Sequence, residues 1–202
     1  MKKLIAVIVS CLVFSTNAAV ISLDFSSTFT NYGNQFENGV VKAENNGSSL
    51  SMNGNNWVAF SGPFVIEKDT VFEITFFSSR IGELHGFGFD SDDVFESASD
   101  YRKGANRYFQ LAGSQKFGVQ KYNTYKDVGT IQTFLVDVGS FITGTFNYLV
   151  FINDQDREGL SANSVYSIKG PGGNLASVSE PITLYVFLFS LIVLFTSCRL
   201  KR

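Results

Sequence analysis

The sequence contains little cysteine and histidine, and each scarcity excludes a class of chemistry. The two cysteines, Cys11 and Cys198, lie close to the two ends of the 202-residue chain. A domain formed by the residues between them therefore has no disulfide, no thiol nucleophile and no cysteine-ligated zinc. A serine hydrolase would have to use His85, the single histidine, and no G-x-S-x-G motif accompanies it.

Charge is also scarce, since charged residues make up 17% of the chain. Residues 19–176 contain 17 acidic and 11 basic residues, a formal charge of 11 − 17 = −6. Nucleic acids and anionic lipids are bound by clustered Lys and Arg side chains. The composition of this middle region therefore argues against both as partners.

The N-terminus has the layout of a secretory signal peptide. Lys2 and Lys3 form a basic start, residues 4–14 are largely apolar, and small residues surround Ala18. A charged region, a short apolar region and a small-residue cleavage site in this order are typical of exported proteins. We therefore predict a signal peptide over residues 1–18, removed by signal peptidase.

The C-terminal region predicts a transmembrane helix. Residues 182–198 contain no charge over 17 positions, which is close to the minimum length for crossing a bilayer core. Three basic residues follow immediately (Arg199, Lys201 and Arg202), and such a flank stays on the cytoplasmic side. Together with a cleaved signal peptide, this arrangement leaves the middle domain outside the inner membrane, attached through its C-terminus.

The last residues also carry a sorting motif. Ser179-Glu180-Pro181 precedes the apolar segment and the terminal basic cluster. Residues 179–202 resemble the PEP-CTERM sorting tail, with Ser179 in place of the first proline. The resemblance implies processing by an exosortase and a final place at the cell surface or in the extracellular matrix. The small, polar residues 170–178 are predicted to link the domain to this tail.

The middle region, residues 19–169, predicts an all-β domain. In the stretch TVFEITFF, Phe72, Ile74 and Phe76 alternate with more polar residues, as in a strand with one buried face. The stretch IQTFLVDV alternates in the same way, and NYLVFIN is apolar on both faces, as in a central strand. Short strands separated by Asn-Gly and Ser-Gly turns favour an antiparallel β-sandwich of the jelly-roll kind.

Two strands run into acidic clusters. GFGFDSDD ends in Asp90 and Asp92, and LVFINDQD ends in Asn153, Asp154 and Asp156. Carboxylate and amide oxygens are the ligands that Ca²⁺ prefers, so the two strand ends together could hold a calcium ion. This hypothesis requires Asp90 and Asp154 to be neighbours in space. The alternative is that these side chains only bond to the backbone of their own turns.

Aromatic residues in polar surroundings indicate a sugar-binding surface. Tyr122 and Tyr125 flank Asn123 in the stretch KYNTYKD, and Trp57 follows two asparagines. Sugar sites combine an apolar wall with a few placed polar groups, so the two tyrosines are the stronger candidates. Trp57 is either such a platform or a core residue.

A longer pattern supports carbohydrate binding. GELHGFGFDSDD, RYFQLAGSQKFGVQKYNTY and ITGTFNYLVFINDQD are similar, in order and spacing, to a β-sandwich module appended to secreted bacterial polysaccharide-degrading enzymes. The resemblance implies a non-catalytic, carbohydrate-binding role. The resemblance adds Glu83 and His85 to the candidate ligand-binding residues. Phe117 stands where the module tends to have tryptophan.

These observations favour an exported surface or matrix protein that binds polysaccharide, such as an exopolysaccharide, without catalysis. The first alternative is a structural matrix or biofilm protein without a specific ligand. The second is a glycan-active hydrolase or lyase, which needs two carboxylates about 5 to 10 Å apart. Glu73, Glu83 and Asp90 supply carboxylates, but the paired-carboxylate strand of laminarinase-like sandwiches is absent from the sequence.

Overall fold

A computed structural model describes residues 21–95, 105–157 and 161–170 of the chain. The predicted signal peptide, the predicted sorting tail and, apart from Gly170, the predicted linker lie outside these residues. Across the residues that the structure describes, no helix has both the length and the apolar character that a membrane crossing requires. The predicted domain boundaries and membrane segment therefore stay predictions.

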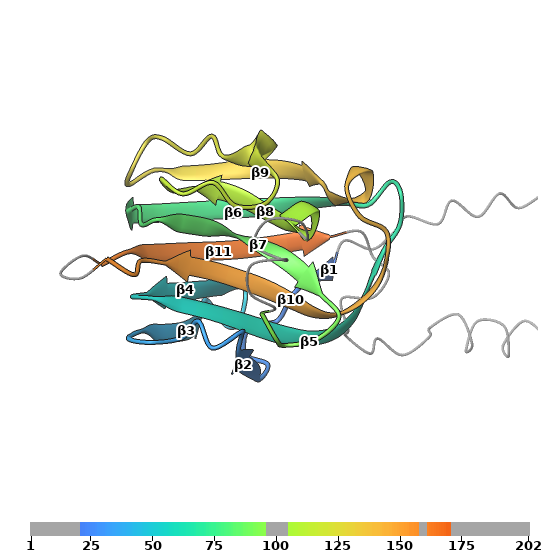
Figure 1. Cartoon of the computed structure of the whole chain (residues 1–202), viewed down its shortest axis with the longest axis horizontal. Coiled ribbons are helices and arrows are strands. Elements are labelled where there is room, and N and C mark those ends of the chain that lie inside the picture. The colour runs from blue at the N-terminus through green and yellow to red at the C-terminus, as the bar shows by residue number, and fades with distance from the viewer. Residues whose placement is uncertain (1–20, 96–104, 158–160, 171–202) are drawn as a thin grey trace, which may run out of the picture.

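The described residues form strands joined by turns and short 3-10 helices (Figure 1). The strands are β1 (Ile21–Ser22), β2 (Phe29–Asn31), β3 (Val40–Glu44), β4 (Ser49–Asn53), β5 (Asn56–Ile66), β6 (Val71–Arg80), β7 (Leu84–Asp90), β8 (Tyr108–Ala112), β9 (Ile131–Asp137), β10 (Gly144–Asp154) and β11 (Asn163–Gly170). The 3-10 helices are η1 (Ala105–Arg107), η2 (Gln120–Tyr122) and η3 (Val138–Ser140). The all-β prediction is confirmed.

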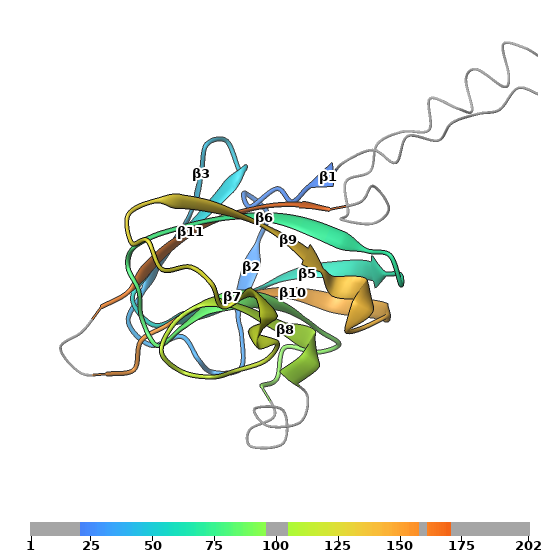
Figure 2. The same ribbon diagram turned by 90° about the horizontal axis from the view of Figure 1, so that it is seen from above.

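The strands form two antiparallel sheets. The first has the order β3-β4-β11-β6-β9, with β1 also paired to β11, and the second has the order β2-β5-β10-β7-β8. Figure 2 shows β6, β9 and β11 in one layer and β5, β7, β8 and β10 in the other. The strand pairs β4–β11, β5–β10, β6–β9 and β7–β8 are nested like those of one long, rolled hairpin, which is the jelly-roll arrangement.

The main core lies between the two sheets. As the alternation predicts, Phe72, Ile74 and Phe76 of β6 are buried on one face of that strand. They meet Phe87 and Phe89 of β7, which come from the opposite sheet. Burying one such side chain contributes about 1.5–3 kcal/mol, so this apolar layer stabilises the domain by several such contributions.

A second apolar cluster covers the outer face of the β5-β10-β7-β8 sheet. Val58 of β5 belongs to the core between the sheets, whereas its neighbour Trp57 belongs to the second cluster. Adjacent strand residues point to opposite faces, so this sheet is buried on both sides. The Trp57 ring stacks on Tyr32 with centroids 6.3 Å apart and an interplanar angle of 9°. Burial on both sides explains why NYLVFIN, in the central strand β10, is apolar on both faces.

Candidate functional site

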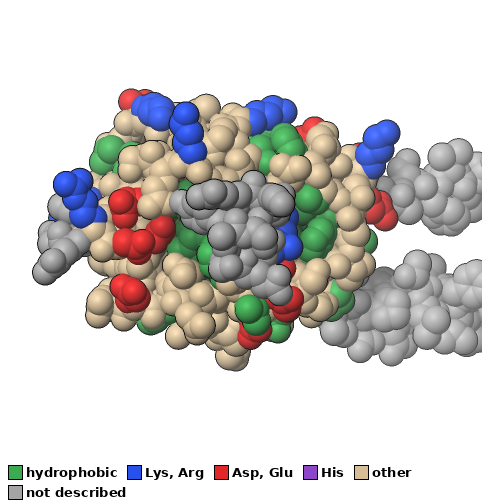
Figure 3. Space-filling model, viewed as in Figure 1, with side chains coloured by type: hydrophobic (Ala, Val, Ile, Leu, Met, Phe, Trp, Pro, Cys, Tyr) green, Lys and Arg blue, Asp and Glu red, His purple; other side chains and the backbone are tan. Residues whose placement is uncertain are grey.

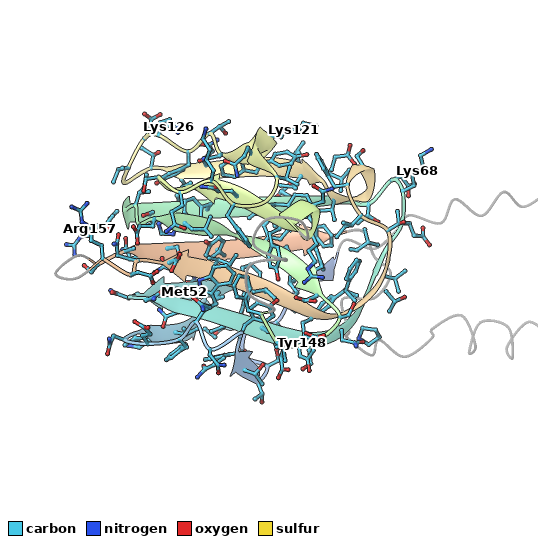
Figure 4. The ribbon with its side chains drawn as sticks, viewed as in Figure 1. Met52, Lys68, Lys121, Lys126, Tyr148 and Arg157 are labelled. Carbon is cyan, nitrogen blue, oxygen red and sulfur yellow. The ribbon has the colours of Figure 1, made fainter. Side chains whose placement is uncertain are left out.

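An open cleft of about 410 Å³ lies at one end of the two sheets. Its walls come from three segments that follow strand ends: the turn between β6 and β7, the connection from β8 to β9, and the residues after β10. Figure 4 shows Lys126 and Arg157, from two of these segments, at the same end of the molecule, with Lys68 at the other end. The lining residues are Ile81, Gly82, Glu83, Gly113, Ser114, Tyr125, Lys126, Gln155 and Arg157.

Glu83 holds the walls of the cleft together. Its backbone N–H donates to the carbonyl of Asp154 at 2.9 Å, and its own carbonyl accepts from the N–H of Gln115 at 2.9 Å. Its carboxylate Oε2 accepts from the N–H of Asp156 at 3.1 Å. At Gly113, with φ of +117°, an added Cβ would lie 2.3 Å from the Glu83 carbonyl oxygen, so only glycine fits this close approach.

Three carboxyl groups meet beside the cleft, namely those of Glu83, Asp154 and Asp156. Figure 3 shows acidic side chains gathered at this end of the molecule, near basic ones. Burial, together with the charges of Asp156 and Glu83, raises the pKa of Asp154 to about 7. Asp156 is exposed, and its Oδ1 accepts a hydrogen bond from the amide of Asn55 at 2.7 Å.

Three buried polar atoms in this region have no hydrogen-bond partner among the described residues. They are Oδ1 of Asp154, Nε1 of Trp57 and Nε2 of Gln155. The Trp57 indole N–H lies beside the Asp154 carboxyl and, as a hydrogen-bond donor, opposes the rise of its pKa. Asp154 and Trp57 are buried beside each other, whereas Gln155 lines the cleft. The Gln155 amide is therefore the donor that a hydroxyl group of a ligand, or a water, can satisfy.

The structure brings together only part of the predicted site. Glu83, Asp154 and Asp156 lie together, with the indole of Trp57 beside Asp154. Ser114, Lys126 and Gln155 lie within the quoted stretches but were assigned no role, and Arg157 lies just beyond them. These four residues were missed because only the strand topology brings them together. Together with Glu83, these four residues form the polar lining of the cleft.

The prediction that Asp90 and Asp154 are neighbours in space is wrong. Strands β7 and β10 are antiparallel, and the register pairs Asp90 with Tyr148 and Asp154 with Leu84. The two aspartates are therefore separated by six residues along the strands, roughly 20 Å at about 3.3 Å per residue. Two strands that each end in an acidic cluster place these clusters at opposite ends when they pair antiparallel. A calcium site shared by both clusters is excluded by this geometry.

Asp90 is instead part of a buried polar network. Its side chain is 2% exposed and forms an ion pair with Arg107, with Nη2 and Oδ2 3.1 Å apart. The hydroxyl of Tyr108 donates to Oδ2 at 3.0 Å, and the hydroxyl of Tyr32 donates to the same atom. The N–H of Ser91 donates to Oδ1 at 2.7 Å. Both carboxylate oxygens are therefore engaged within the protein.

The other two predicted calcium ligands are also placed apart from the acidic cluster. Asn153 faces the core, where its Oδ1 accepts from Ser164 at 2.8 Å and its amide donates to the carbonyl of Gly54. Asp92 is exposed near Asp90 and accepts from the N–H of Val94 at 3.1 Å, as a turn residue does. No group of three or more His, Cys, Asp or Glu residues in the described ranges is arranged to hold a metal ion. Calcium binding as such stays a prediction.

The expected stacking surface of Tyr122 and Tyr125 is wrong. The two rings are 8% and 1% exposed and belong to the core. Their segment runs from β8, at the edge of one sheet, to β9, at the edge of the other, so the rings fill the opening between the sheets. The Tyr125 hydroxyl accepts from the N–H of Ser78 at 3.0 Å and donates toward its carbonyl at 2.9 Å. Asn123, between the tyrosines, is half-buried beside Gln120 and does not line the cleft.

Trp57 and His85 are also buried. Trp57 is 2% exposed under Tyr32, Phe95 and Phe117, which resolves the open choice in favour of a core residue. His85 is 0% exposed and faces the core, where its Nε2 accepts from the N–H of Gly82 at 2.6 Å. Burial lowers the pKa of His85 to about 3, so its imidazole is neutral. Neither ring can contact a ligand at the surface.

Comparison with known proteins assigns no family to the chain. No protein-family model matches it, and no curated protein matches it. Among solved structures, it is similar to the glycoside hydrolase domain of Endo-D from Streptococcus pneumoniae R6, with 15% identity and a TM-score of 0.39. The match covers 70% of this chain and 21% of that chain. At this TM-score the likeness carries no argument about fold or function, and the two family resemblances stay predictions.

Proposed function

We propose that the β-domain binds a carbohydrate, without catalysis, in the cleft between Glu83, Ser114, Gln155 and Arg157. The observation that carries the proposal is the polar lining of this open cleft, with an acceptor on Glu83 and donors on Ser114 and Gln155, of which Nε2 of Gln155 has no hydrogen-bond partner among the described residues. A cation would satisfy only the acceptor, and an anion only the donors. The hydroxyl groups of a sugar satisfy both.

Binding of this kind is weak. The aromatic residues predicted to stack on a sugar are buried, so hydrogen bonds supply the affinity. A hydrogen bond contributes about 1 kcal/mol net, and three or four of them give about 4 kcal/mol. That corresponds to a Kd of about 1 mM for one sugar unit. A polymer with many units, displayed beside many copies of the protein, gains avidity from repeated contacts.

The absence of catalysis in the proposal rests on two residues. His85, the single histidine, is buried and neutral, so it is not placed to exchange protons with a ligand. Asp154, whose pKa of about 7 would suit a general acid, is only 5% exposed. A general acid must come within hydrogen-bond reach of the atom that it protonates.

The proposal includes the cellular setting that the sequence predicts. Signal peptidase removes residues 1–18, the segment 182–198 holds the chain in the inner membrane, and an exosortase processes the tail. These steps are supported by the basic start, the uncharged segment and the terminal basic cluster of the sequence. The polysaccharide ligand would then be one outside the cell, such as an exopolysaccharide.

Burial of the predicted aromatic platform favours a second candidate, a structural matrix protein without a specific ligand. Affinity electrophoresis of the full chain through gels containing different polysaccharides separates the two. We expect retardation by at least one polymer, lost in Glu83→Ala and Gln155→Ala and kept in the matched control Asp92→Asn at the other end of the domain. No retardation by any polymer would support the structural candidate. Release of reducing ends that Glu83→Gln abolishes would support a hydrolase.

Calcium assistance is retained in the proposal at Asp154 and Asp156 alone, because the Asp90 cluster lies at the other end of the sheet. A ligand that binds only the native state raises its stability. We therefore expect EDTA to lower the Tm and added calcium to restore it, with no such response in Asp154→Asn. An unchanged Tm in the wild-type protein would remove calcium from the proposal.

A further inference from the structure

Strand β9 forms one edge of its sheet, and its outer face is apolar. Figure 1 shows β9 at the rim of the sheet, with β6 and β11 successively further in. Ile131 and Leu135 are 72% and 68% exposed, the highest values among the large apolar side chains that the structure describes, and Thr133 between them is also exposed. Residues 128–136 contain no charge and no proline. Ile131, Thr133 and Leu135, hereafter the β9 edge, therefore offer solvent an uncharged surface.

The backbone groups of the β9 edge point away from the sheet. The N–H of Asp137 donates to the Tyr122 hydroxyl at 2.9 Å and so points away from β6. Backbone groups of a strand alternate in direction, so those of every second residue before Asp137 point the same way. The hydroxyls of Thr133 and Thr75 approach to 3.3 Å across the β6–β9 pair, as in a residue pair without backbone hydrogen bonds between its members. The N–H and carbonyl groups of the β9 edge are thus available to another strand, with no partner in the described ranges.

The other sheet edges are protected against such pairing. Strand β3, at the far edge of the same sheet, carries Lys42 and Glu44, and β2 is three residues long. Strand β8 is covered by Val119, which accepts from the N–H of Gln110 at 3.2 Å and donates to the carbonyl of Tyr108 at 2.8 Å. Charge, short length and cover are usual means by which proteins keep sheet edges from pairing. Within the described structure β9 has none of them, and its register with β6 runs without a bulge.

We infer that β9 pairs antiparallel with β9 of a second copy of this chain, about a twofold axis at Thr133. In this register Ile131 of each copy lies opposite Leu135 of the other, and Thr133 lies opposite itself. All three residue pairs use outward-pointing backbone groups, so each exchanges two N–H···O=C bonds. Phe77 of β6 lies beside Ile131 in the sheet and is half-buried, so it lengthens the apolar row on the outer face. The contact is isologous and closes after two copies.

A second copy fits the β9 edge in charge. A partner strand recognised through charge would need charged groups on this edge, and residues 128–136 have none. An identical strand is not repelled, as it would be by a row of like charges. The charge beside Leu135 is that of Glu73 on β6, which already pairs with Lys169 of its own copy at 3.0 Å. The pairing therefore brings no unpaired charge into the contact.

The register about Thr133 is also the one that the free groups allow. Moving the axis by one residue, to Phe134, would set the Asp137 carboxylate opposite Ile131. It would also need the N–H of Asp137, which already bonds to Tyr122. The register about Thr133 uses only free backbone groups and sets apolar side chains opposite each other.

The area involved indicates a weak dimer. Two isoleucine and two leucine side chains, at roughly 100 Å² of apolar surface each, bury about 400 Å². Backbone contacts add to this, but the total stays below the ~1,200 Å² at which stable interfaces begin. We therefore expect a Kd of about 0.1 mM, so that the chain is monomeric when dilute and dimeric when crowded. The inference does not depend on the proposed carbohydrate binding.

Sedimentation equilibrium of the full chain in detergent, from about 10 µM to about 1 mM, measures this Kd. Thr133→Lys sets two lysines opposite each other at the axis and is expected to raise the Kd about fivefold or more. Thr133→Glu should do the same. An equimolar mixture of the two variants should dimerise at least as well as the wild type, because lysine then faces glutamate. Val40→Lys is the matched control, since Val40 is 53% exposed on β3, at the other edge of the same sheet, and should leave the Kd unchanged.

Each outcome decides the inference, with thermal melts to establish that the variants are folded. Disruption by both Thr133 variants, rescue in their mixture and no effect of Val40→Lys would support it. A wild type that stays monomeric at the highest concentration would overturn it and leave the edge to a strand of another protein. A dimer that Thr133→Lys leaves unchanged, or one that is lost in both variants without rescue in the mixture, would mean that Thr133 does not face its copy. Association beyond a dimer would require head-to-tail contacts and would equally overturn the inference.

Discussion

The N–H of Asp156 donates to Oε2 of Glu83 at 3.1 Å, which joins the residues after β10 to the turn between β6 and β7. The backbone N–H of Glu83 in turn donates to the carbonyl of Asp154 at 2.9 Å. These two bonds fix the acidic wall of the cleft. They also bring the charge of Glu83 close to the buried carboxyl of Asp154, where it raises the pKa of that carboxyl.

Glu83→Gln is expected to lower the pKa of Asp154 below its value of about 7. The glutamate charge disfavours ionisation of the neighbouring aspartate, and glutamine removes that charge while keeping an acceptor for the Asp156 N–H. Carbon-13 NMR titration of the Asp154 carboxyl measures the change. Glu44→Gln, on the edge strand β3, is the control and should leave the titration as it is. An unchanged midpoint in Glu83→Gln would show that the two groups are not coupled.

Asp154 makes the domain less stable as the pH rises. Its pKa is raised from 3.8 to about 7, so between these values the native state holds a proton that the unfolded state has released. Stability is therefore lost as pH increases from about 4 to about 7, by at most about 1.4 kcal/mol per pH unit. Asp154→Asn removes this dependence. Urea unfolding at pH 5, 6, 7 and 8 should show the free energy of unfolding of the variant rising relative to that of the wild type as pH increases. A constant difference between the two would refute the raised pKa of Asp154.

The strands could be predicted from the sequence because their signal is local. Phe72, Ile74 and Phe76 alternate with polar residues, and they bury the face that the alternation predicts. The two apolar faces of β10 likewise follow from its central place in a sheet that is covered on both sides. The alternation of apolar residues along a strand directly indicates which of its faces is buried, so a single sequence is enough to predict both the strand and its buried face.

The site could not be predicted in the same way, because it depends on register and on what covers each face. Asp90 and Asp154 end similar strands, and only the antiparallel pairing reveals that they point to opposite ends. Tyr122 and Tyr125 stand in a polar stretch, yet that stretch crosses the gap between two sheet edges and its rings fill the gap. Glu83, Asp154 and Asp156 could each be named as candidates from the sequence, and they do lie together because the strand ends that carry them are adjacent.

Asp90→Asn is expected to destabilise the domain by about 3 kcal/mol or more. Asp90 is 2% exposed and balances Arg107 while accepting from two tyrosine hydroxyls. Removing one partner of a buried ion pair leaves the other charge uncompensated, which typically costs about 3–5 kcal/mol. Asp92→Asn, two residues away and exposed, should change stability by less than about 0.5 kcal/mol. Urea unfolding at pH 7 compares the two variants, and similar losses would argue against the network.

His85→Ala tests the opposite pH dependence. Burial lowers the pKa of His85 from 6.5 to about 3, so between these values the unfolded state binds a proton that the native state does not. Stability from this residue is therefore present above pH 6.5 and lost as the pH falls toward 3. In the window from about 4 to 6.5 this loss offsets the gain from Asp154, and the wild-type profile is flatter there than either contribution alone.

The variant should separate the two contributions. Loss of the buried ring is expected to cost about 3 kcal/mol at pH 7, as for other large core side chains replaced by alanine. Below pH 6.5 the deficit should shrink, because the variant no longer has a histidine to keep neutral. Urea unfolding from pH 4 to pH 8 measures both the deficit at pH 7 and its change with pH. A deficit that stays constant with pH would mean that His85 is protonated as readily in the native state as in the unfolded chain.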